Sequence, residues 1–543
     1  MGFVSDNFGL LYLGAAAVVY FKPEYTICDS RSLTILLLFT TLTFVKIVHR
    51  MILYPRFFTP IKHIQTPPNR HWLTGNGDTV FHETPHSRMK EWIKILPNEG
   101  LIRFYMTGNM EQVVITSTRA LGEFLVTKNY DFVKPRTMRQ NLSRILGEGV
   151  LLAEGDVHKF QRKNLMPAFA YRHIKDLYPV FWSKATEMTR LIKEDLKARE
   201  STGDNVIQIR NWVSRATLDI IGVAGMGQDF DSLRDPGNIL SQSYNRIFVP
   251  QSSFGRFLFV IGVLLGNMHI FQKFPTQHNK IIDENVKVIR DAARRMIAEK
   301  KEKMKDSSAE TGIDIISVAM RDGIFDEENL VDQLMTFLGA GHETTATAMQ
   351  WAIYALSKNP DVQTRLREEI RANLPPISLD NPAPMSAAAI DNLPYLHAVC
   401  NEVLRFHPSV PNTVRIAAKD TTLVDKAIPK GTFFVIAPEL INHMEEYWGP
   451  DADKFNPDRF MGQGMANTGG ATSNYALLTF LHGPRGCIGQ GFAKSELACL
   501  LAATVGSFEF ALRDPDAELE IRRGATVSPK DGVMVHLTPL EGW

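Results

Sequence analysis

Apolar positions gather in two long runs at the amino terminus. Phe8–Phe21 reads FGLLYLGAAAVVYF and is shorter than the roughly 20 residues that a spanning helix needs. Leu33–Val45 continues past Lys46 into IVHRMILY, and this stretch is long enough to span a bilayer. Because basic residues follow it, the positive-inside bias predicts a cytoplasmic body and disfavours the alternative, buried helices of a soluble domain. We predict an N-terminal membrane anchor and basic linker over residues 1–65 and a single large body over 66–543.

The body repeats apolar positions mainly at helical spacing. Residues 178–200 and 279–304 are long amphipathic runs with charged faces. The longest pattern starts near Asp326 and ends at Asn359, because Pro360 stops it; at 1.5 Å per residue such a helix is roughly 50 Å long. Strand-like pieces are short: LIRFYM, QVVITS, TTLV, TFFVIA and MVHLTP. The pattern predicts a mainly α protein with small β-sheets.

Composition narrows the function classes. The 543 residues carry a net charge of +1, which provides no electrostatic case for nucleic acid as a partner. The four cysteines are too few for a disulfide framework, which favours a reduced, cytosol-facing body.

One cysteine differs from the others in its surroundings. Cys400 and Cys499 lie in helical runs, as small buried hydrophobes do. Cys487 lies instead in FLHGPRGCIG, a glycine-rich and basic stretch. Zinc fits poorly, since no second cysteine or histidine stands beside it at ligand spacing. A thiolate serving as the sole protein ligand of an iron macrocycle fits better, because the glycines let the backbone approach a flat ring and Arg485 can pair with a propionate.

The same stretch resembles a known family. Five positions match the F-x-x-G-x-R-x-C-x-G signature of the cytochrome P-450 superfamily of haem-thiolate monooxygenases: Phe480, Gly483, Arg485, Cys487 and Gly489. Further motifs follow in the family's order, so the resemblance covers nearly the whole chain. It implies the cytochrome P-450 fold, with haem b between the long central helix and the cysteine loop and Cys487 as the axial iron ligand.

Two further segments resemble motifs that have a structural role in the family. EVLR contains Glu402 and Arg405, and FNPDRF contains Arg459. The resemblance implies that these three form a buried charge triad behind the haem. On its own, E-x-x-R would be an ordinary i,i+3 helix pair.

The resemblance also implies which residues contact the haem propionates. Arg415 and Arg162 occupy positions of propionate-binding arginines, and His158 stands where the family usually has tryptophan. For His482 two interpretations stay open, a propionate contact and a solvated loop histidine.

AGHETT (Ala340–Thr345) lies midway along the longest helical pattern. It resembles the family's A-G-x-[DE]-T-T, which implies that Glu343 and Thr344 deliver protons during dioxygen activation. We expect Gly339 and Gly341 to loosen this helix, the alternative being that they permit close packing.

The resemblance further implies the partners. Electrons come from a separate NADPH-cytochrome P-450 reductase, with cytochrome b5 as a possible second donor, and Lys159, Arg162 and Lys163 are candidates for a basic docking face. The alternative for these three is a solvated charge run. We expect a monomeric catalytic unit on the cytoplasmic face of the endoplasmic reticulum membrane. The apolar run Phe254–Phe271 is either a third span or, as we prefer, a lid that dips into the membrane lipid.

The few charges in the expected pocket segments favour an apolar small molecule of terpenoid, polyketide, sterol or fatty acyl type, as in fungal secondary metabolism. Three alternatives stay open: an isomerase or dehydratase that does not need O2, a xenobiotic-detoxifying monooxygenase, and a haem-binding membrane sensor. Glu343 and Thr344 together argue against the first and the last, since neither needs proton delivery to dioxygen.

Overall fold

The structure is a computed structural model that describes the chain except for residues 1–7, 23, 25, 73, 78–84, 98, 248–271, 273–275, 306–313, 322 and 378–384. The apolar run Phe254–Phe271 therefore lies outside the described residues. The chain divides into two compact units, Met1–Val133 with Asn412–Leu440 and Lys134–Pro411 with Ile441–Trp543. Each unit is described by itself below.

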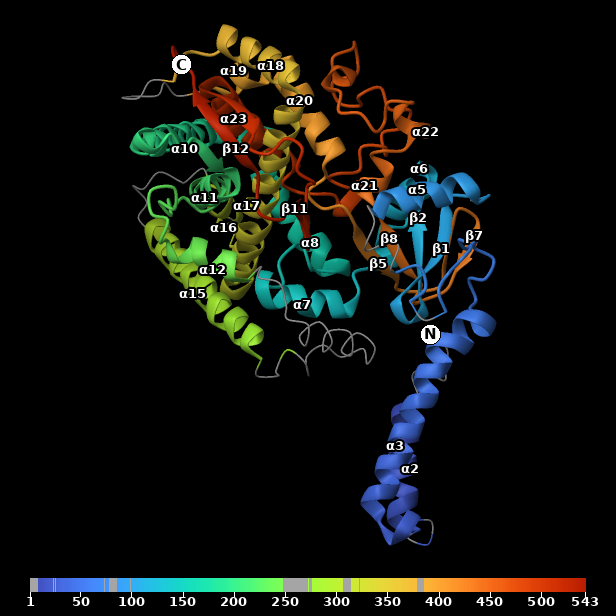
Figure 1. The fold of residues 1–543 in the computed structure, drawn as a ribbon. Coiled ribbons are helices and arrows are strands. Elements are labelled where there is room, and N and C mark those ends of the chain that lie inside the picture. The colour runs from blue at the N-terminus through green and yellow to red at the C-terminus, as the bar shows by residue number, and fades with distance from the viewer. Residues whose placement is uncertain are drawn as a thin grey trace. The chain divides into compact units, whose positions relative to one another are not determined.

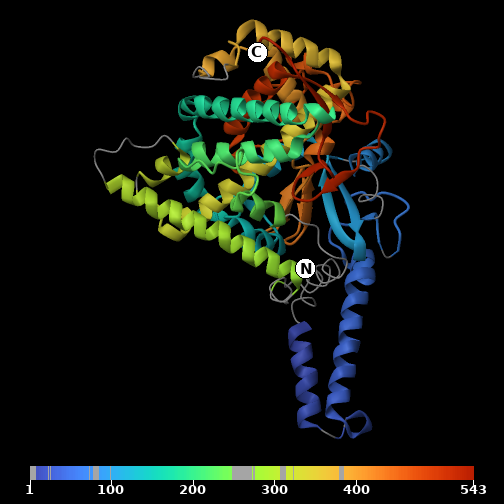
Figure 2. The same cartoon turned by 60° about the vertical axis from the view of Figure 1, so that its left-hand side comes forward.

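The first unit begins with two apolar helices that lie side by side, α2 (Phe8–Phe21) and α3 (Arg31–Val48) (Figures 1 and 2). Ser30 caps α3, because its hydroxyl oxygen accepts a hydrogen bond from the backbone N–H of Leu33 (3.3 Å). The helix continues as a wider helical turn to Phe58. Residues 31–58 contain an 18-residue stretch with a mean hydropathy of 1.7 and, within the described part of the chain, form the one helix long and apolar enough to cross a membrane.

The remainder of the first unit is a five-stranded sheet in the order β1-β2-β8-β5-β3. β2 and β8 are parallel, and the other neighbouring strands are antiparallel. Its aromatic core includes the stacked rings of Phe124 and Phe132, whose centroids lie 3.9 Å apart. The elements of this part are α5 (Pro85–Ile95), β1 (Leu101–Met106), β2 (Met110–Ile115), α6 (Thr118–Gly122), β3 (Phe132–Val133), β5 (Thr413–Ala417), β6 (Thr421–Leu423), β7 (Lys426–Ile428) and β8 (Phe433–Ile436).

The second unit is built around α17 (Glu327–Lys358), a helix of 32 residues that packs against α11, α15 and α23 (Figure 1). Asp326 caps it by accepting a hydrogen bond from the N–H of Asn329 (2.8 Å), and Pro360 follows its end. The predicted limits of the longest helix are thus confirmed. The longer helices of this unit are α7 (Arg136–Leu146), α8 (Gly155–Leu165), α10 (Tyr178–Ala198), α11 (Ile209–Ile220), α12 (Ile239–Ile247), α15 (Gln277–Lys305), α16 (Ile315–Met320), α18 (Pro360–Asn373), α20 (Pro394–Phe406) and α23 (Gln490–Ser507).

Two small sheets complete the second unit. One has the order β4-β12-β9 and comprises Val206–Gln208, Met534–Pro539 and Phe508–Leu512. The other is a hairpin of β10 (Ile521–Arg523) and β11 (Val527–Pro529). The mainly α class with small sheets is confirmed, and all five predicted strand segments overlap strands.

Candidate active site

The loop that carries Cys487 folds back on itself. The backbone N–H of Cys487 donates to the carbonyl of Phe480 (2.8 Å). Between them the chain turns through two left-handed residues, Leu481 at a φ of 57° and Gly483 at 73°. Such a conformation is strained for leucine, so the surrounding loop must stabilise it. The loop ends at Gly489, which is the N-cap of α23.

The sulfur of Cys487 combines accessibility with a polar surrounding. The residue is exposed, although protein atoms surround it closely enough that burial raises the pKa of the thiol. The N–H of Gly489, which hydrogen-bonds to the sulfur, and the positive charge of Arg162 both act to lower this pKa. The described residues contain no group of three or more His, Cys, Asp and Glu side chains suited to a metal. A single thiol that receives a backbone N–H and lies near a positive charge suits a metal that is held mainly by another ligand.

Two arginines support the cysteine loop. Nη1 of Arg162, on α8, donates to the carbonyl of Gly486 (2.6 Å). The guanidinium of Arg485 is buried and forms an ion pair with Glu154, which precedes α8. Glu154 also accepts a hydrogen bond from the backbone N–H of Lys134 (2.8 Å). The loop is thus fixed to the start of α8 through charged and backbone contacts.

The histidines predicted near the cofactor differ in their exposure to solvent. His158 is buried on α8, one turn before Arg162. His482 is half-buried, its Nε2 lies 3.2 Å from the carbonyl oxygen of Leu477, and burial lowers its pKa. Both interpretations of His482 therefore stay predictions, since its ring is partly exposed and lies close to a backbone carbonyl. Arg415 belongs to the first unit, where its Nη1 donates to Thr413 Oγ1 (3.0 Å) and to the carbonyl of Val414 (2.8 Å).

Glu402, Arg405 and Arg459 come together in a fully enclosed charge triad. Arg405 donates to Glu402 through Nε (2.7 Å) and Nη2 (2.8 Å), and both side chains have no exposed surface. Arg405 also donates to the carbonyls of Asn442 (2.7 Å), Ala452 (2.8 Å) and Lys454 (3.0 Å). Nε of Arg459 donates to Glu402 at 3.3 Å. All five N–H groups of Arg405 are therefore hydrogen-bonded, as a buried guanidinium requires.

Glu343 and Thr344 lie at the middle of α17. The hydroxyl of Thr344 donates back to the carbonyl of Ala340 (2.7 Å). The Oε1 atom of Glu343 accepts hydrogen bonds from Arg522 Nη2 (3.2 Å) and Thr526 Oγ1 (3.3 Å). An acid and an alcohol thus occupy consecutive positions, and the acid is held by the β10–β11 hairpin.

The glycines beside this pair permit close packing. α17 is a continuous α-helix from Glu327 to Lys358, so the expected loosening is not observed. A Cβ on Gly339 would collide with the side chain of Leu146, and a Cβ on Gly341 would lie 3.1 Å from Ile221. The absence of side chains at these positions lets α7 and the end of α11 approach α17.

Three charged residues of this region were missed at the sequence level: Glu154, Arg522 and Glu496. Glu496 lies on α23 and is completely buried; neither of its carboxyl oxygens has a well-formed hydrogen bond to the described residues. Burial raises its pKa well above the usual range, and the nearby hydroxyl of Thr345 opposes this only in part. Nothing in the sequence around Glu496 indicates that this helical carboxyl group is buried.

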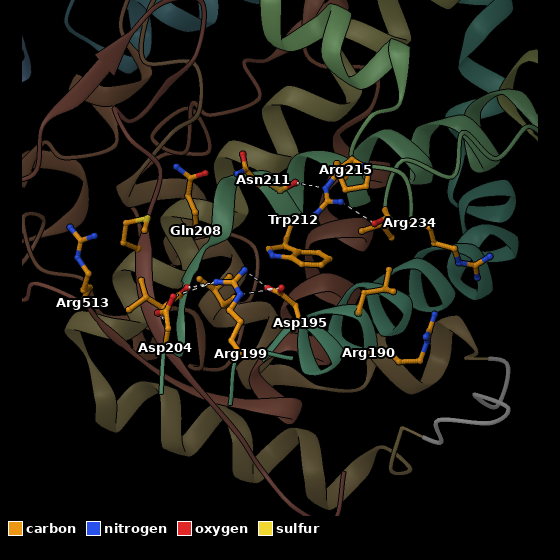
Figure 3. Close-up of a pocket in the computed structure, with 16 residues that line it drawn as sticks. Arg190, Asp195, Arg199, Asp204, Gln208, Asn211, Trp212, Arg215, Arg234 and Arg513 are labelled. Atoms are coloured by element: carbon orange, nitrogen blue, oxygen red, sulfur yellow. Dashed lines mark hydrogen bonds and ion pairs between the residues drawn. The ribbon is translucent and has the colours of Figure 1, made fainter. Parts of the chain in front are cut away.

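A pocket of about 1010 Å³ opens between α10, β4 and α11 and is lined by none of these residues (Figure 3). Arg199 pairs with Asp195 (2.5 Å), and Arg215 lies over the ring of Trp212 and donates to the carbonyl of Leu233 (3.0 Å). The other lining arginines also pair with carboxylates. Because none of the predicted site residues lines it, this pocket is not the candidate active site.

Comparison with known proteins agrees with the motifs. The family model described as Cytochrome P450 matches residues 66–536. The chain is 62% identical over 543 residues to cytochrome P450 monooxygenase sphH of Aspergillus fumigatus, covering 100% of both chains. It is 41% identical to cytochrome P450 monooxygenase FUM15 of Gibberella moniliformis (94% of this chain, 95% of that one) and 38% identical to FSL4 of Gibberella zeae (91% of each).

Proposed function

This chain belongs to the cytochrome P450 family of haem monooxygenases, and on that premise we propose that it oxidises an apolar small molecule in fungal secondary metabolism. One observation carries the proposal. The sulfur of the exposed residue Cys487 accepts a hydrogen bond from the backbone N–H of Gly489, directly before α23. Helix α23 packs against α17, the helix that carries Glu343 and Thr344. The loop that carries Cys487 thus leads into a helix that contacts the helix of Glu343 and Thr344, which supports our proposal that Cys487 is the thiolate ligand and the pair delivers protons.

The residues present fit a haem group, and we propose haem b with Cys487 as its axial ligand. Family members use a haem iron with a cysteine thiolate. When bound, the haem supplies dioxygen chemistry: one oxygen atom enters the substrate and the other leaves as water, with uptake of two electrons and two protons. Arg162, Arg485, His158 and His482 are the candidates for holding the propionates, and the family motif makes Arg415 a further candidate. In this proposal Arg485 exchanges or shares its Glu154 contact with a propionate.

Glu343 and Thr344 would move the protons. The carboxyl group of Glu343 is the acid that takes protons from solvent, and the hydroxyl of Thr344 passes them to the reacting oxygen. Glu402, Arg405 and Arg459 have a structural role, since their charges are satisfied by one another and by backbone groups.

We propose residues 66–543 as the catalytic domain and residues 1–65 as its anchor in the endoplasmic reticulum membrane, with the body facing the cytoplasm. The apolar helix of residues 31–58 and the basic residues around its end support this topology. Monooxygenases of this family require a redox partner, and we propose a separate NADPH-dependent flavoprotein reductase, assisted by cytochrome b5. Lys159 and Lys163 are exposed and are the candidates for docking, although Lys159 also pairs with Asp156, whereas Arg162 donates to Gly486.

Two measurements test the proposal. The reduced, CO-bound protein should show the red-shifted Soret band of thiolate ligation, and Cys487→Ala should lose it; retention of the band in that variant would refute the ligand assignment. Thr344→Ala should bind haem normally and consume NADPH in the presence of reductase, but release more peroxide per NADPH. Unchanged coupling in Thr344→Ala would exclude the proton-delivery role.

The substrate class requires a separate experiment. Untargeted comparison of metabolites from strains with and without the gene should reveal an apolar compound and its product one oxygen atom heavier. Turnover without oxygen consumption would instead identify an isomerase or dehydratase, and haem binding without turnover would favour a sensor.

A further inference from the structure

The β10–β11 hairpin is fastened to the central helix close to the acid–alcohol pair. Nε1 of Trp351, on α17, donates to the carbonyl of Val527 (2.8 Å). The N–H of Val527 donates to the carbonyl of Ser409 (2.9 Å), and the hydroxyl of Ser409 donates to the carbonyl of Thr344 (2.9 Å). The hairpin therefore has a defined position relative to the residues around Thr344.

From this position the hairpin contacts only one oxygen of Glu343. Arg522 Nη2 lies 3.2 Å from Oε1, and Thr526 Oγ1 lies 3.3 Å from the same atom. Arg522 is itself steadied by Ser528 Oγ at 3.3 Å. The side chains of Glu343 and Arg522 are 12% and 19% exposed, so solvent screens this ion pair less than a surface pair.

The other oxygen, Oε2, makes no hydrogen bond to the described residues. A carboxyl group protonated at Oε2 can still accept the hydrogen bond of Arg522 at Oε1. The hydrogen bond from Arg522 to Oε1 can therefore persist whether or not Oε2 carries a proton, and it limits the rotation of the carboxyl group.

A second cation lies in the same cluster. Arg210, at the start of α11, is near enough that the positive charge of Arg522 adds to burial in lowering its pKa, while the charge of Glu343 opposes the shift. Arg210 therefore acts on Glu343 only through its charge, whereas Arg522 makes the hydrogen bond.

We propose that Arg522 is a positioning residue for proton delivery, which holds Oε1 of Glu343 so that Oε2 exchanges protons with solvent and with the Thr344 side. This inference rests on the proposed function. In each cycle the proton leaves Oε2 as the O–H bond breaks, and the carboxylate regains a proton at Oε2 from solvent; no electrons are gained or lost at Glu343. Arg522 contacts neither substrate nor cofactor in this role and acts through Glu343.

The test compares Arg522→Gln with Arg523→Gln in the full-length enzyme reconstituted with reductase, using lauric acid as an apolar probe. Arg523 is the neighbouring, exposed residue on the same strand and therefore a matched control. We expect Arg522→Gln to slow NADPH oxidation about tenfold and to raise the solvent isotope effect, at unchanged haem content; loss of a general acid itself costs about 10²-fold or more. Arg522→Lys, which keeps the charge without the planar fork, should recover part of the rate, and Arg523→Gln should behave as the parent.

Non-additivity is the decisive readout. If Arg522 acts through Glu343, Arg522→Gln should have no further effect in a Glu343→Gln background. An equal slowing in both backgrounds, or unchanged turnover and isotope effect in Arg522→Gln, would overturn the proposal. If Arg522→Gln does not fold, the Lys variant carries the same comparison.

A second readout does not depend on turnover. A double-mutant cycle on the denaturant midpoint should show coupling between Arg522 and Glu343, and no coupling would refute the ion pair. Failure of the proposed function would give a different result, because Thr344→Ala would then form as much product per NADPH as the parent, with or without the Arg522 substitution. If Thr344→Ala uncouples and Arg522→Gln does not slow turnover, the inference about Arg522 alone is wrong.

Discussion

Replacing Arg405 by leucine tests the energetic role of the buried triad. The variant leaves Glu402 buried with only the N–H of Asn456 (2.7 Å) and Arg459 (3.3 Å) as partners. It also removes the donors to three backbone carbonyls. Breaking one partner of a buried ion pair costs about 3–5 kcal/mol, and we expect a loss of stability in that range.

The assay is denaturant unfolding of the full-length protein in detergent, followed by tryptophan fluorescence. Trp448 is a suitable reporter, because the guanidinium carbon of Arg405 lies 5.1 Å from its ring centroid. The matched control is Lys159→Leu, which removes the i,i+3 pair with Asp156 on an exposed helix face and should leave the midpoint unchanged within error.

A double variant separates charge from packing. Glu402→Leu with Arg405→Leu leaves no lone carboxylate, so it should be less destabilised than Arg405→Leu alone. If Arg405→Leu accumulates only as unfolded protein, Arg405→Lys is measured instead, and it should still be destabilised because one ammonium group cannot reach five acceptors. A cost for Arg405→Leu no larger than that of the control would refute the reasoning.

Three further predictions concern other parts of the chain. Burial raises the pKa of Glu496, so the native state resists its ionisation and the parent protein loses stability as the pH rises above the unfolded pKa of about 4.5. The free energy of unfolding of Glu496→Gln, measured by denaturant unfolding at several pH values, should therefore rise relative to that of the parent by up to about 1.4 kcal/mol per pH unit until the folded pKa is passed. Gly339→Ala should cost about 1–3 kcal/mol through overpacking against Leu146, and the Leu146→Ala background should reduce that cost; equal costs in both backgrounds would contradict the packing explanation. Full-length protein should remain in membranes after carbonate extraction, whereas a variant lacking residues 1–65 should be extracted, and extraction of both would argue against the anchor.

Local signals predicted much of the architecture. Asp326 and Pro360 mark the ends of α17 in the sequence because capping and helix termination depend on the residues at those positions. The apolar run that becomes α3 was recognisable by its length alone. In contrast, strands of three residues such as β10 are too short to show a period of two, and their existence depends on a partner strand.

The site was predictable only in part, for a related reason. Motif order indicated Cys487 and the triad, but the partners of Arg485 and Glu343 lie far away in the chain. Whether Gly339 loosens a helix or admits a neighbour depends on Leu146, a residue of another element. Contacts of this kind arise from tertiary structure, which no local pattern encodes.

The hydrogen bonds of Arg405 have a consequence for sequence variation. Three of its five N–H groups bind main-chain carbonyls, at residues 442, 452 and 454, and contact no side chain there. The course of this segment is therefore constrained while the identity of most of its side chains is not. In a comprehensive mutational scan, residues 443–453 should accept many substitutions at exposed positions, but inserting or deleting one residue there should abolish folding, because it would carry a carbonyl out of reach of the guanidinium.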